Sequence, residues 1–204
     1  MEIVFLDFDG VLNNDKFFHL RLDELTKERD HKWSLLKFFD INKIKPEQIH
    51  RVEKVKYFYT EMSYENVKNF IRIFKNIPDV KIVLSTSWRH GVSVYDWNQM
   101  FKAIPNWNFE IIGVTDSYDD IIKDYPELKV DSRLKIINRP IRGVEIKHWL
   151  ETNLFSSYKY VILDDCEVML PEQEKNYVRT TFKKGLTMCQ EAKIIKILGG
   201  NNEC

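Results

Sequence analysis

The sequence predicts an α/β fold with a doubly wound parallel sheet flanked by helices, and two observations support this prediction. Four apolar runs have the length and composition of strands buried on both faces, at residues 3–6, 80–84, 109–114 and 160–163. Segments with helical periodicity lie between them. Strands that alternate with helices indicate βαβ units, in which neighbouring strands run parallel.

Four helices are expected from periodicity and end signals, and they begin near Ser63, Ser93, Gly143 and Thr187. In the first, a candidate N-cap serine is followed by apolar residues at i, i+3, i+4 and i+7, which is the spacing of one buried helix face. These residues are Val67, Phe70, Ile71 and Phe74. In the last, Gln190 stands three residues after Thr187, as in a capping box, and Gly199 ends the apolar stripe.

The composition is typical of one soluble globular domain, which we expect to span residues 1–204. Hydrophobic residues make up 44% of the chain and charged residues 30%. The 31 basic and 31 acidic residues give a formal net charge of zero, so no global basic field indicates nucleic acid. A leader pattern and an apolar stretch of membrane-spanning length are not found, and the three cysteines lack a CxxC pair. We therefore expect a cytoplasmic protein with reduced thiols and no membrane contact.

Asp7 and Asp9 follow the first apolar run, so two carboxylates stand at the C-terminal tip of a buried strand. Side chains in an extended segment repeat every second residue, which puts both carboxylates on one face. Two like charges this close repel unless a proton or a cation intervenes, and a hard divalent ion such as Mg²⁺ would also attract phosphate. The pattern therefore indicates phosphoryl-transfer chemistry, with Gly10 turning the backbone away from the site. A strand that ends in an ordinary Asp-Gly turn is the alternative.

The second strand also ends in polar residues suited to phosphate. Ser85 and Thr86 follow it directly, and Arg89 comes three residues later. Their hydroxyl, backbone amide and guanidinium groups can all donate to phosphate oxygens. Alone this signal is weak, because serine clusters at strand ends usually form turns or caps.

Asp164 and Asp165 follow the fourth strand, where an acidic pair near the sheet would be costly unless a cation neutralised it. Arg142 and Lys147 lie in the helix that leads into that strand. A cation there could neutralise the charge between a nucleophilic carboxylate and a phosphate. Taken singly, each of these two cations is better explained as an exposed surface residue.

Residues 14–60 interrupt the alternation of strands and helices, since they put far more chain after the first strand than a βα loop requires. We expect them to form a small inserted helical cap over the active-site end, with helices at about 17–29 and 46–59. Basic and aromatic residues are interleaved there, as in surfaces that bind single strands by phosphate contact and stacking. A solvated helix face whose aromatic residues pack on the main domain is the alternative, and we favour it.

Together, and in this order, these motifs resemble the haloacid dehalogenase (HAD) superfamily, and the likeness runs to about Leu198. It comprises Asp-x-Asp-Gly-Val, a strand followed by serine, a cation at a helix start and a strand followed by Asp-Asp. The closer likeness is to the HAD domain of Swiss Army Knife RNA repair proteins. It is carried by residues 5–13, 83–89 and 161–165, by the helix with Arg142-Gly143 and Trp149-Leu150, and by Gly185-Leu186-Thr187. The stretch from Ser85 to Arg89 is also similar to the phosphatase domain of polynucleotide kinase-phosphatases.

The resemblance implies a Rossmann-like fold and hydrolysis of a phosphomonoester in two steps. Asp7 would attack phosphorus to form an aspartyl-phosphate, and Asp9 would protonate the leaving oxygen and then activate water. Ser85, or Thr86 in its place, would hydrogen-bond the transferred phosphoryl group. Arg142 would stabilise its charge.

The same resemblance implies a Mg²⁺ ion and contacts to the substrate. The metal ligands would be Asp7, the backbone carbonyl of Asp9, Asp164 and Asp165. The candidate substrate-binding residues are Gly10, Thr86, Arg89 and Lys147. The superfamily usually has lysine in its third motif, so either Arg142 or Lys147 would fill that role.

The leading hypothesis is a Mg²⁺-dependent phosphatase, and the family likeness and the insertion favour RNA or DNA ends as its substrate. The zero net charge favours a nucleotide or small phosphometabolite instead. A non-enzyme binding or scaffold protein with the same fold is the third hypothesis, and the intact acidic motifs weigh against it. The preference between 3′ and 5′ ends and the oligomeric state stay open.

Overall fold

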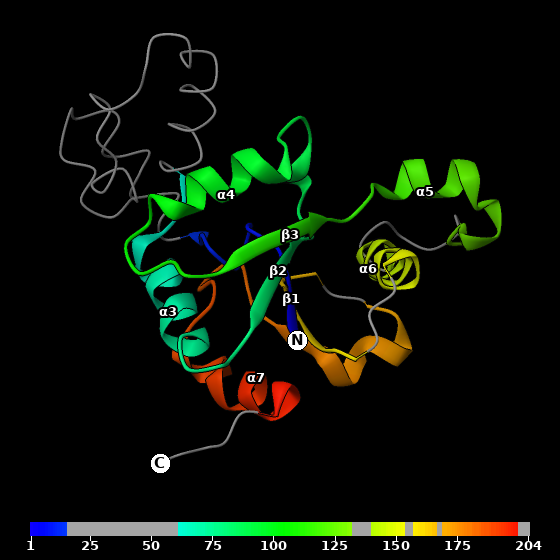
Figure 1. The fold of residues 1–204 in the computed structure, drawn as a ribbon. Helices are drawn as coiled ribbons and strands as arrows, with labels where there is room; N and C mark the ends of the chain where they lie inside the picture. Colours follow the sequence, from blue (N-terminus) through cyan, green and yellow to red (C-terminus); the bar gives the residue numbers. More distant parts are fainter. Residues whose placement is uncertain (16–60, 132–139, 154–156, 167–168, 200–204) are drawn as a thin grey trace, which may run out of the picture.

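The structure is a computed structural model that describes residues 1–15, 61–131, 140–153, 157–166 and 169–199. Within these residues, five strands form one parallel sheet in the order β3-β2-β1-β4-β5 (Figure 1). The strands are β1 (Glu2–Leu6), β2 (Val80–Leu84), β3 (Glu110–Val114), β4 (Lys159–Asp164) and β5 (Tyr177–Arg179). The predicted doubly wound, Rossmann-like α/β fold is therefore confirmed, and the strand order reverses between β1 and β4.

Helices cover both faces of the sheet (Figure 1). One face carries α3 (Tyr64–Phe74), α4 (Val94–Lys102) and α7 (Glu191–Leu198). The other carries α6 (Ile141–Thr152), against which α5 (Tyr118–Asp124) packs. Short 3₁₀ helices are η4 (Ser87–Arg89), η5 (Pro126–Leu128), η7 (Pro171–Asn176) and η8 (Met188–Gln190).

The strand β1 is buried on both sides because it contributes to two cores. Val4 and Leu6 pack in the core with α3, α4 and α7, whereas Ile3 and Phe5 pack in the core with α6. All four side chains are inaccessible, which explains the unbroken apolar run of this strand. The alternation continues past the end of the strand, so Asp7 points to the α6 side.

Two of the predicted helix caps are confirmed. Oγ of Ser63 accepts from the backbone N–H of Asn66 at 3.5 Å, at the start of α3. Oγ of Ser93 accepts from the backbone N–H of Asp96 at 3.1 Å, at the start of α4. Each serine thus satisfies one of the amides that a helix leaves open at its first turn.

The capping box predicted at Thr187 and Gln190 is confirmed. The box starts the 3₁₀ helix η8, and α7 continues directly from it at Glu191. A 3₁₀ turn is common at the start of an α-helix, which explains why the box stands one turn ahead of α7. The end of α7 is predicted correctly, since Gly199 stands there with a φ of +73°.

The expected cap at 14–60 lies outside the described residues, apart from Asn14 and Asp15, so the cap stays a prediction. Among the helices that the structure describes, none is both long and apolar enough to cross a membrane. Cys166 and Cys189 are free thiols, as the scattered cysteines predict.

Candidate active site

Asp7, Ser85 and Asp164 lie side by side at the C-terminal ends of the three central strands. The strands β1, β2 and β4 are in register at these ends. The backbone N–H of Asp7 donates to the Leu163 carbonyl at 3.0 Å, and that of Ser85 donates to the Leu6 carbonyl at 2.9 Å. All three side chains are buried. The row thus stands where the strand order reverses, which is the place where α/β folds bind ligands.

Arg142, in the first turn of α6, joins the two carboxylates of this row. Its Nε donates to Oδ2 of Asp164 at 3.0 Å, and its Nη2 lies 3.8 Å from Oδ1 of Asp7. A hydrogen bond also holds the first turn of α6, since Nε2 of Gln173 donates to the Gly143 carbonyl at 2.9 Å. The structure therefore brings together three of the residues that the sequence proposes for the site.

Asp7 carries a charge that its surroundings disfavour. Burial and then the nearby charge of Asp164 raise the pKa of Asp7 well above its usual range. The Arg142 guanidinium and hydrogen bonds from the Phe8 amide and the Thr86 side chain lower it. A further cation beside Asp7 would favour the ionised carboxylate.

Asp9 lies in the turn after β1, and two donors hold its carboxylate. Nδ2 of Asn13 donates to Oδ1 at 2.8 Å, and Nε1 of Trp88 donates to Oδ2 at 3.0 Å. Oδ1 of Asn13 also accepts from the backbone N–H of Gly10 at 2.9 Å and so closes the turn. Asp9 is only partly buried, whereas Asp7 is buried. Two carboxylates in such different surroundings can take different chemical roles.

Gly10 lets Asp165 approach the backbone of this turn. Its φ of +67° lies in the left-handed region, and a Cβ at this position would overlap Oδ2 of Asp165. Burial and then the charges of Asp164 and Asp9 raise the pKa of Asp165. Asp165 is therefore a second acidic group of the site whose negative charge is disfavoured.

Ser85 and Thr86 follow β2, and their hydroxyl groups have different partners. The Ser85 hydroxyl is buried and has no hydrogen-bond partner among the described residues. The Thr86 side chain hydrogen-bonds Asp7 and also accepts from the backbone N–H of Trp88 at 3.3 Å. Because a buried hydroxyl without a partner costs about 1–3 kcal/mol, an oxygen of a ligand or of water fits at Ser85.

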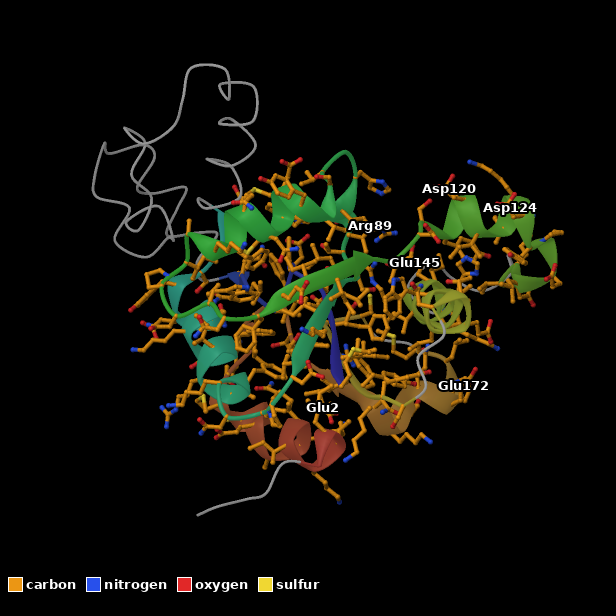
Figure 2. All side chains as sticks on the ribbon, viewed as in Figure 1. Glu2, Arg89, Asp120, Asp124, Glu145 and Glu172 are labelled. Atoms are coloured by element: carbon orange, nitrogen blue, oxygen red, sulfur yellow. The ribbon has the colours of Figure 1, made fainter. Side chains whose placement is uncertain are left out.

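Arg89 and Arg142 share one buried carboxylate, that of Glu145, and Figure 2 shows Arg89 and Glu145 next to each other beside α6. Oε1 of Glu145 accepts from Nη2 of Arg89 at 2.7 Å, and Oε2 accepts from Nη1 of Arg142 at 2.8 Å. Burial alone would lower the pKa of Arg142, but Asp7, Asp164 and Glu145 together raise it. Arg142 therefore stays charged at any physiological pH.

Lys147 lies away from these groups. Its Nζ is 3.9 Å from Oε1 of Glu151 and 3.7 Å from Oε1 of Glu172, and all three side chains are exposed. Figure 2 shows Glu172 well apart from Arg89 and Glu145. Of the two cations proposed for the third motif, the structure thus places Arg142 beside the central aspartates.

The acidic groups of the site offer the oxygen ligands that Mg²⁺ prefers. Ligand atoms of Asp164, Asp165 and Cys166 lie within 4.8 Å of one another, and Asp7 stands beside Asp164. Burial and then Asp164 raise the pKa of the Cys166 thiol, so it stays protonated and is a poor ligand for a hard cation. The disfavoured charges of Asp7 and Asp165 are what a divalent ion would stabilise. The donor set therefore fits Mg²⁺.

The sequence alone assigns no role to Asn13, Trp88 or Glu145. Glu145 stands three residues after Arg142, a spacing that puts two side chains on one helix face and could have indicated their ion pair. Asn13 stands four residues after Asp9 in a turn, which is a weaker signal. The hydrogen bond from Trp88 to Asp9 joins residues 79 positions apart, and no local pattern predicts it.

The chain matches the family model described as the HAD domain in Swiss Army Knife RNA repair proteins, over residues 3–190. This range includes Asp7, Asp9, Ser85, Arg142, Asp164 and Asp165. No curated protein and no solved structure matches the chain.

Proposed function

The protein belongs to the family of HAD domains in Swiss Army Knife RNA repair proteins, and from this premise we propose that it is a Mg²⁺-dependent phosphatase acting on phosphomonoesters. The observation that carries the proposal is the row of Asp7, Ser85 and Asp164, with Arg142 bound to both carboxylates. Such a site combines a buried nucleophile (Asp7), a hydroxyl donor without a partner among the described residues (Ser85) and a cation held by ion pairs (Arg142). Phosphoryl transfer requires these parts.

Asp7 is the nucleophile in this proposal. One of its carboxylate oxygens attacks phosphorus, the bond from phosphorus to the leaving oxygen breaks, and Asp9 gives a proton to that oxygen. Asp9 then takes a proton from water as the water oxygen attacks the aspartyl-phosphate. The bond between phosphorus and Asp7 breaks, which releases inorganic phosphate and the free carboxylate. The two donors on Asp9, Asn13 and Trp88, support its separate role because they fix the orientation of its carboxylate.

Three groups of this chain would stabilise the transferred phosphoryl group. The Ser85 hydroxyl has no other partner among the described residues, so it is free to donate to a phosphoryl oxygen. The Thr86 side chain is engaged with Asp7, which favours Ser85 over Thr86 for this contact. Arg142 would offset the negative charge of the phosphate, and Arg89 would bind a phosphate oxygen of the substrate.

The residues proposed to hold Mg²⁺ are Asp7, the backbone carbonyl of Asp9, Asp164 and Asp165. When bound, the ion would supply positive charge that keeps Asp7 ionised and offsets the charge of the phosphate. The turn at Gly10 supports this set, because it lets Asp165 approach the loop that carries Asp9.

Phosphorylated RNA or DNA ends are the substrate class that the family membership supports best. The zero net charge supports a nucleotide or small phosphometabolite as the second candidate, since the chain has no global basic field to attract a polyanion. A polynucleotide substrate would therefore depend on local cations, such as Arg89 and Arg142 at the site.

A substrate panel tests this proposal directly. The panel comprises RNA and DNA oligonucleotides with a 3′- or 5′-phosphate, mononucleotides, sugar phosphates and p-nitrophenyl phosphate, each with Mg²⁺ or with EDTA. We expect phosphate release with Mg²⁺ and none with EDTA, and the highest kcat/KM with oligonucleotide ends. If Mg²⁺ supports no release from any of these compounds, the enzyme assignment is wrong and a binding or scaffold role remains.

Salt dependence within the same panel separates the two substrate classes. The KM for an oligonucleotide should rise steeply between about 50 and 200 mM salt, because binding a polyanion releases counterions. The KM for a sugar phosphate should change little. Fastest turnover of a sugar phosphate with a flat salt profile would establish the second candidate instead.

Replacement of Gly10 by alanine should lower both stability and activity. The backbone strain of a side chain at positive φ costs roughly 1–2 kcal/mol, and the new methyl group must also displace Asp165. Gly199→Ala is the matched control, since it creates the same strain at the end of α7, next to Lys159 and thus at the opposite end of β4 from Asp164. We expect both variants to melt at a lower temperature and only Gly10→Ala to lose phosphate release. Equal activities of the two folded variants would argue against a role for Asp165.

A further inference from the structure

Glu145 is buried in α6, and both of its carboxylate oxygens are engaged. Oε2 accepts from Arg142, while Oε1 accepts from Arg89 and from the backbone N–H of Tyr118 at 2.9 Å. Only 6% of its side chain is exposed. Three segments thus meet on one carboxylate: α6, the 3₁₀ helix after β2 and the start of α5 (Figure 2).

We propose that Glu145 is a positioning residue, which holds the guanidinium groups of Arg89 and Arg142 in the orientation in which they bind the substrate phosphate. This inference rests on the proposed function, which assigns both arginines to the phosphate. Glu145 itself does not touch the substrate, because both of its oxygens already accept hydrogen bonds.

The contacts of Arg142 leave one nitrogen directed toward Asp7. Its Nε is bound to Asp164 at 3.0 Å and its Nη1 to Glu145 at 2.8 Å. The planar guanidinium cannot rotate without breaking one of these two bonds. Nη2 is thereby kept 3.8 Å from Oδ1 of Asp7, beside the carboxylate that receives the phosphoryl group. Without Glu145, the bond at Nε would be the one hydrogen bond from the described residues that still holds the group.

The contacts of Arg89 with the described residues also leave one nitrogen without a hydrogen-bond partner. Its Nη1 donates to the Thr86 carbonyl at 2.6 Å, and its Nη2 donates to Glu145 at 2.7 Å and to the Asp116 carbonyl at 3.4 Å. Its Nε is buried and has no hydrogen-bond partner among the residues that the structure describes. A buried donor without a partner is costly, so its orientation is best explained by an oxygen that it meets in the working protein.

If Glu145 acted only through its charge, its replacement would change phosphate binding in the opposite direction from the loss of a positioning residue. Removal of the negative charge of Glu145 makes the site more positive, which on Coulombic grounds alone would tighten the binding of phosphate. Loss of positioning would weaken it, because the guanidinium nitrogens would no longer be fixed toward the anion. The sign of the change in affinity therefore distinguishes the two roles.

The experiment measures the dissociation constant of inorganic phosphate by titration calorimetry in buffer containing Mg²⁺. Glu145→Gln keeps the size of the side chain and loses its charge, whereas Glu145→Asp keeps the charge and is too short to reach both arginines. We expect Kd to rise about tenfold in Glu145→Gln and several-fold in Glu145→Asp. Glu110→Gln is the matched control, since it removes an ion pair with Lys81 at the opposite end of the sheet and should leave Kd unchanged.

A double-mutant cycle on kcat adds a readout that a purely structural role would not move. Because Glu145 acts through Arg142, Glu145→Gln should reduce kcat much less in an Arg142→Lys background than in the wild type. Losses that multiply fully in the double variant would overturn the inference.

The binding measurement also decides the inference without any turnover. Unchanged or tighter phosphate binding in the Glu145 variants would overturn it, and so would a wild-type protein that binds no phosphate. If Glu145→Gln does not fold, Glu145→Asp carries the comparison. A wild-type protein that binds phosphate and hydrolyses no substrate would refute the proposed function alone, and the Kd comparison would still decide the role of Glu145.

Discussion

Asp7→Asn should abolish phosphate release, with kcat falling by at least about 10⁴-fold. The amide is close to the carboxylate in size, but it does not attack phosphorus and forms no aspartyl-phosphate. Loss of phosphate release is measured in single-turnover and steady-state assays with Mg²⁺. Asp124→Asn is the control, because Asp124 is exposed in α5 and Figure 2 shows it far from Arg89 and Glu145. A variant at Asp7 with the wild-type rate would show that another group is the nucleophile.

The same substitution should leave the melting temperature equal or higher in buffer without divalent metal. Asp7 and Asp164 are buried side by side, so removal of one negative charge relieves their repulsion. Part of this gain is offset by the lost ion pair between Asp7 and Arg142, which is long at 3.8 Å.

The stability difference between Asp7→Asn and the wild type should grow with pH. The pKa of Asp7 in the folded protein is raised by burial and by Asp164, so the folded state keeps this proton after the unfolded chain has lost it. Wild-type stability therefore falls as pH rises from the ordinary aspartate pKa through the raised value, and the loss is complete above it. Asparagine has no such loss. Thermal melts at a series of pH values check the sign, and a difference that shrinks with pH would contradict it.

Arg142→Met should lower the free energy of unfolding by about 3–5 kcal/mol, the range found when one partner of a buried ion pair is removed. Arg142 is the cation shared by Asp7, Asp164 and Glu145, so its loss leaves three buried carboxylates without their common partner. The activity should be lost as well, since the same guanidinium stabilises the phosphate.

Denaturant unfolding of Arg142→Met and Lys147→Met provides the comparison within one helix. Lys147 pairs only with exposed carboxylates among the described residues, so its removal should change stability by less than about 0.5 kcal/mol. Arg142→Lys is a further variant, which keeps the charge and loses the planar group that reaches several carboxylates at once. A greater loss of activity at Lys147 than at Arg142 would assign the third-motif role to Lys147.

The central strands and the polar residues at their C-terminal ends could be predicted from the sequence for one physical reason. A parallel strand with helices on both sides is apolar over most of its length, so β1, β2 and β4 each contain a run of three or four consecutive apolar residues. The first polar residue after each run then marks the ligand-binding edge. This logic places Asp7, Ser85 and Asp164 without any knowledge of the fold.

The missed features depend on contacts between distant segments. The strand β5 has only three residues, Tyr177–Arg179, and exists because β4 offers a free edge. The bond from Arg89 to Glu145 joins residues 56 positions apart. The bond from the backbone of Tyr118 to Glu145 joins residues 27 positions apart. Local patterns report helices, caps and turns, and such patterns carry no information on which loop packs against which helix.

The pairing of β1 with β4 has a consequence for how the protein tolerates change. Because the side-chain period of a strand is two, a slip of one residue between these strands would turn the Asp7 carboxylate to the opposite face of the sheet and bring an apolar side chain next to Asp164. The alternation of Ile3, Val4, Phe5 and Leu6 between two hydrophobic cores prevents that slip. Core substitutions that weaken this alternation should therefore impair catalysis without altering any residue of the site.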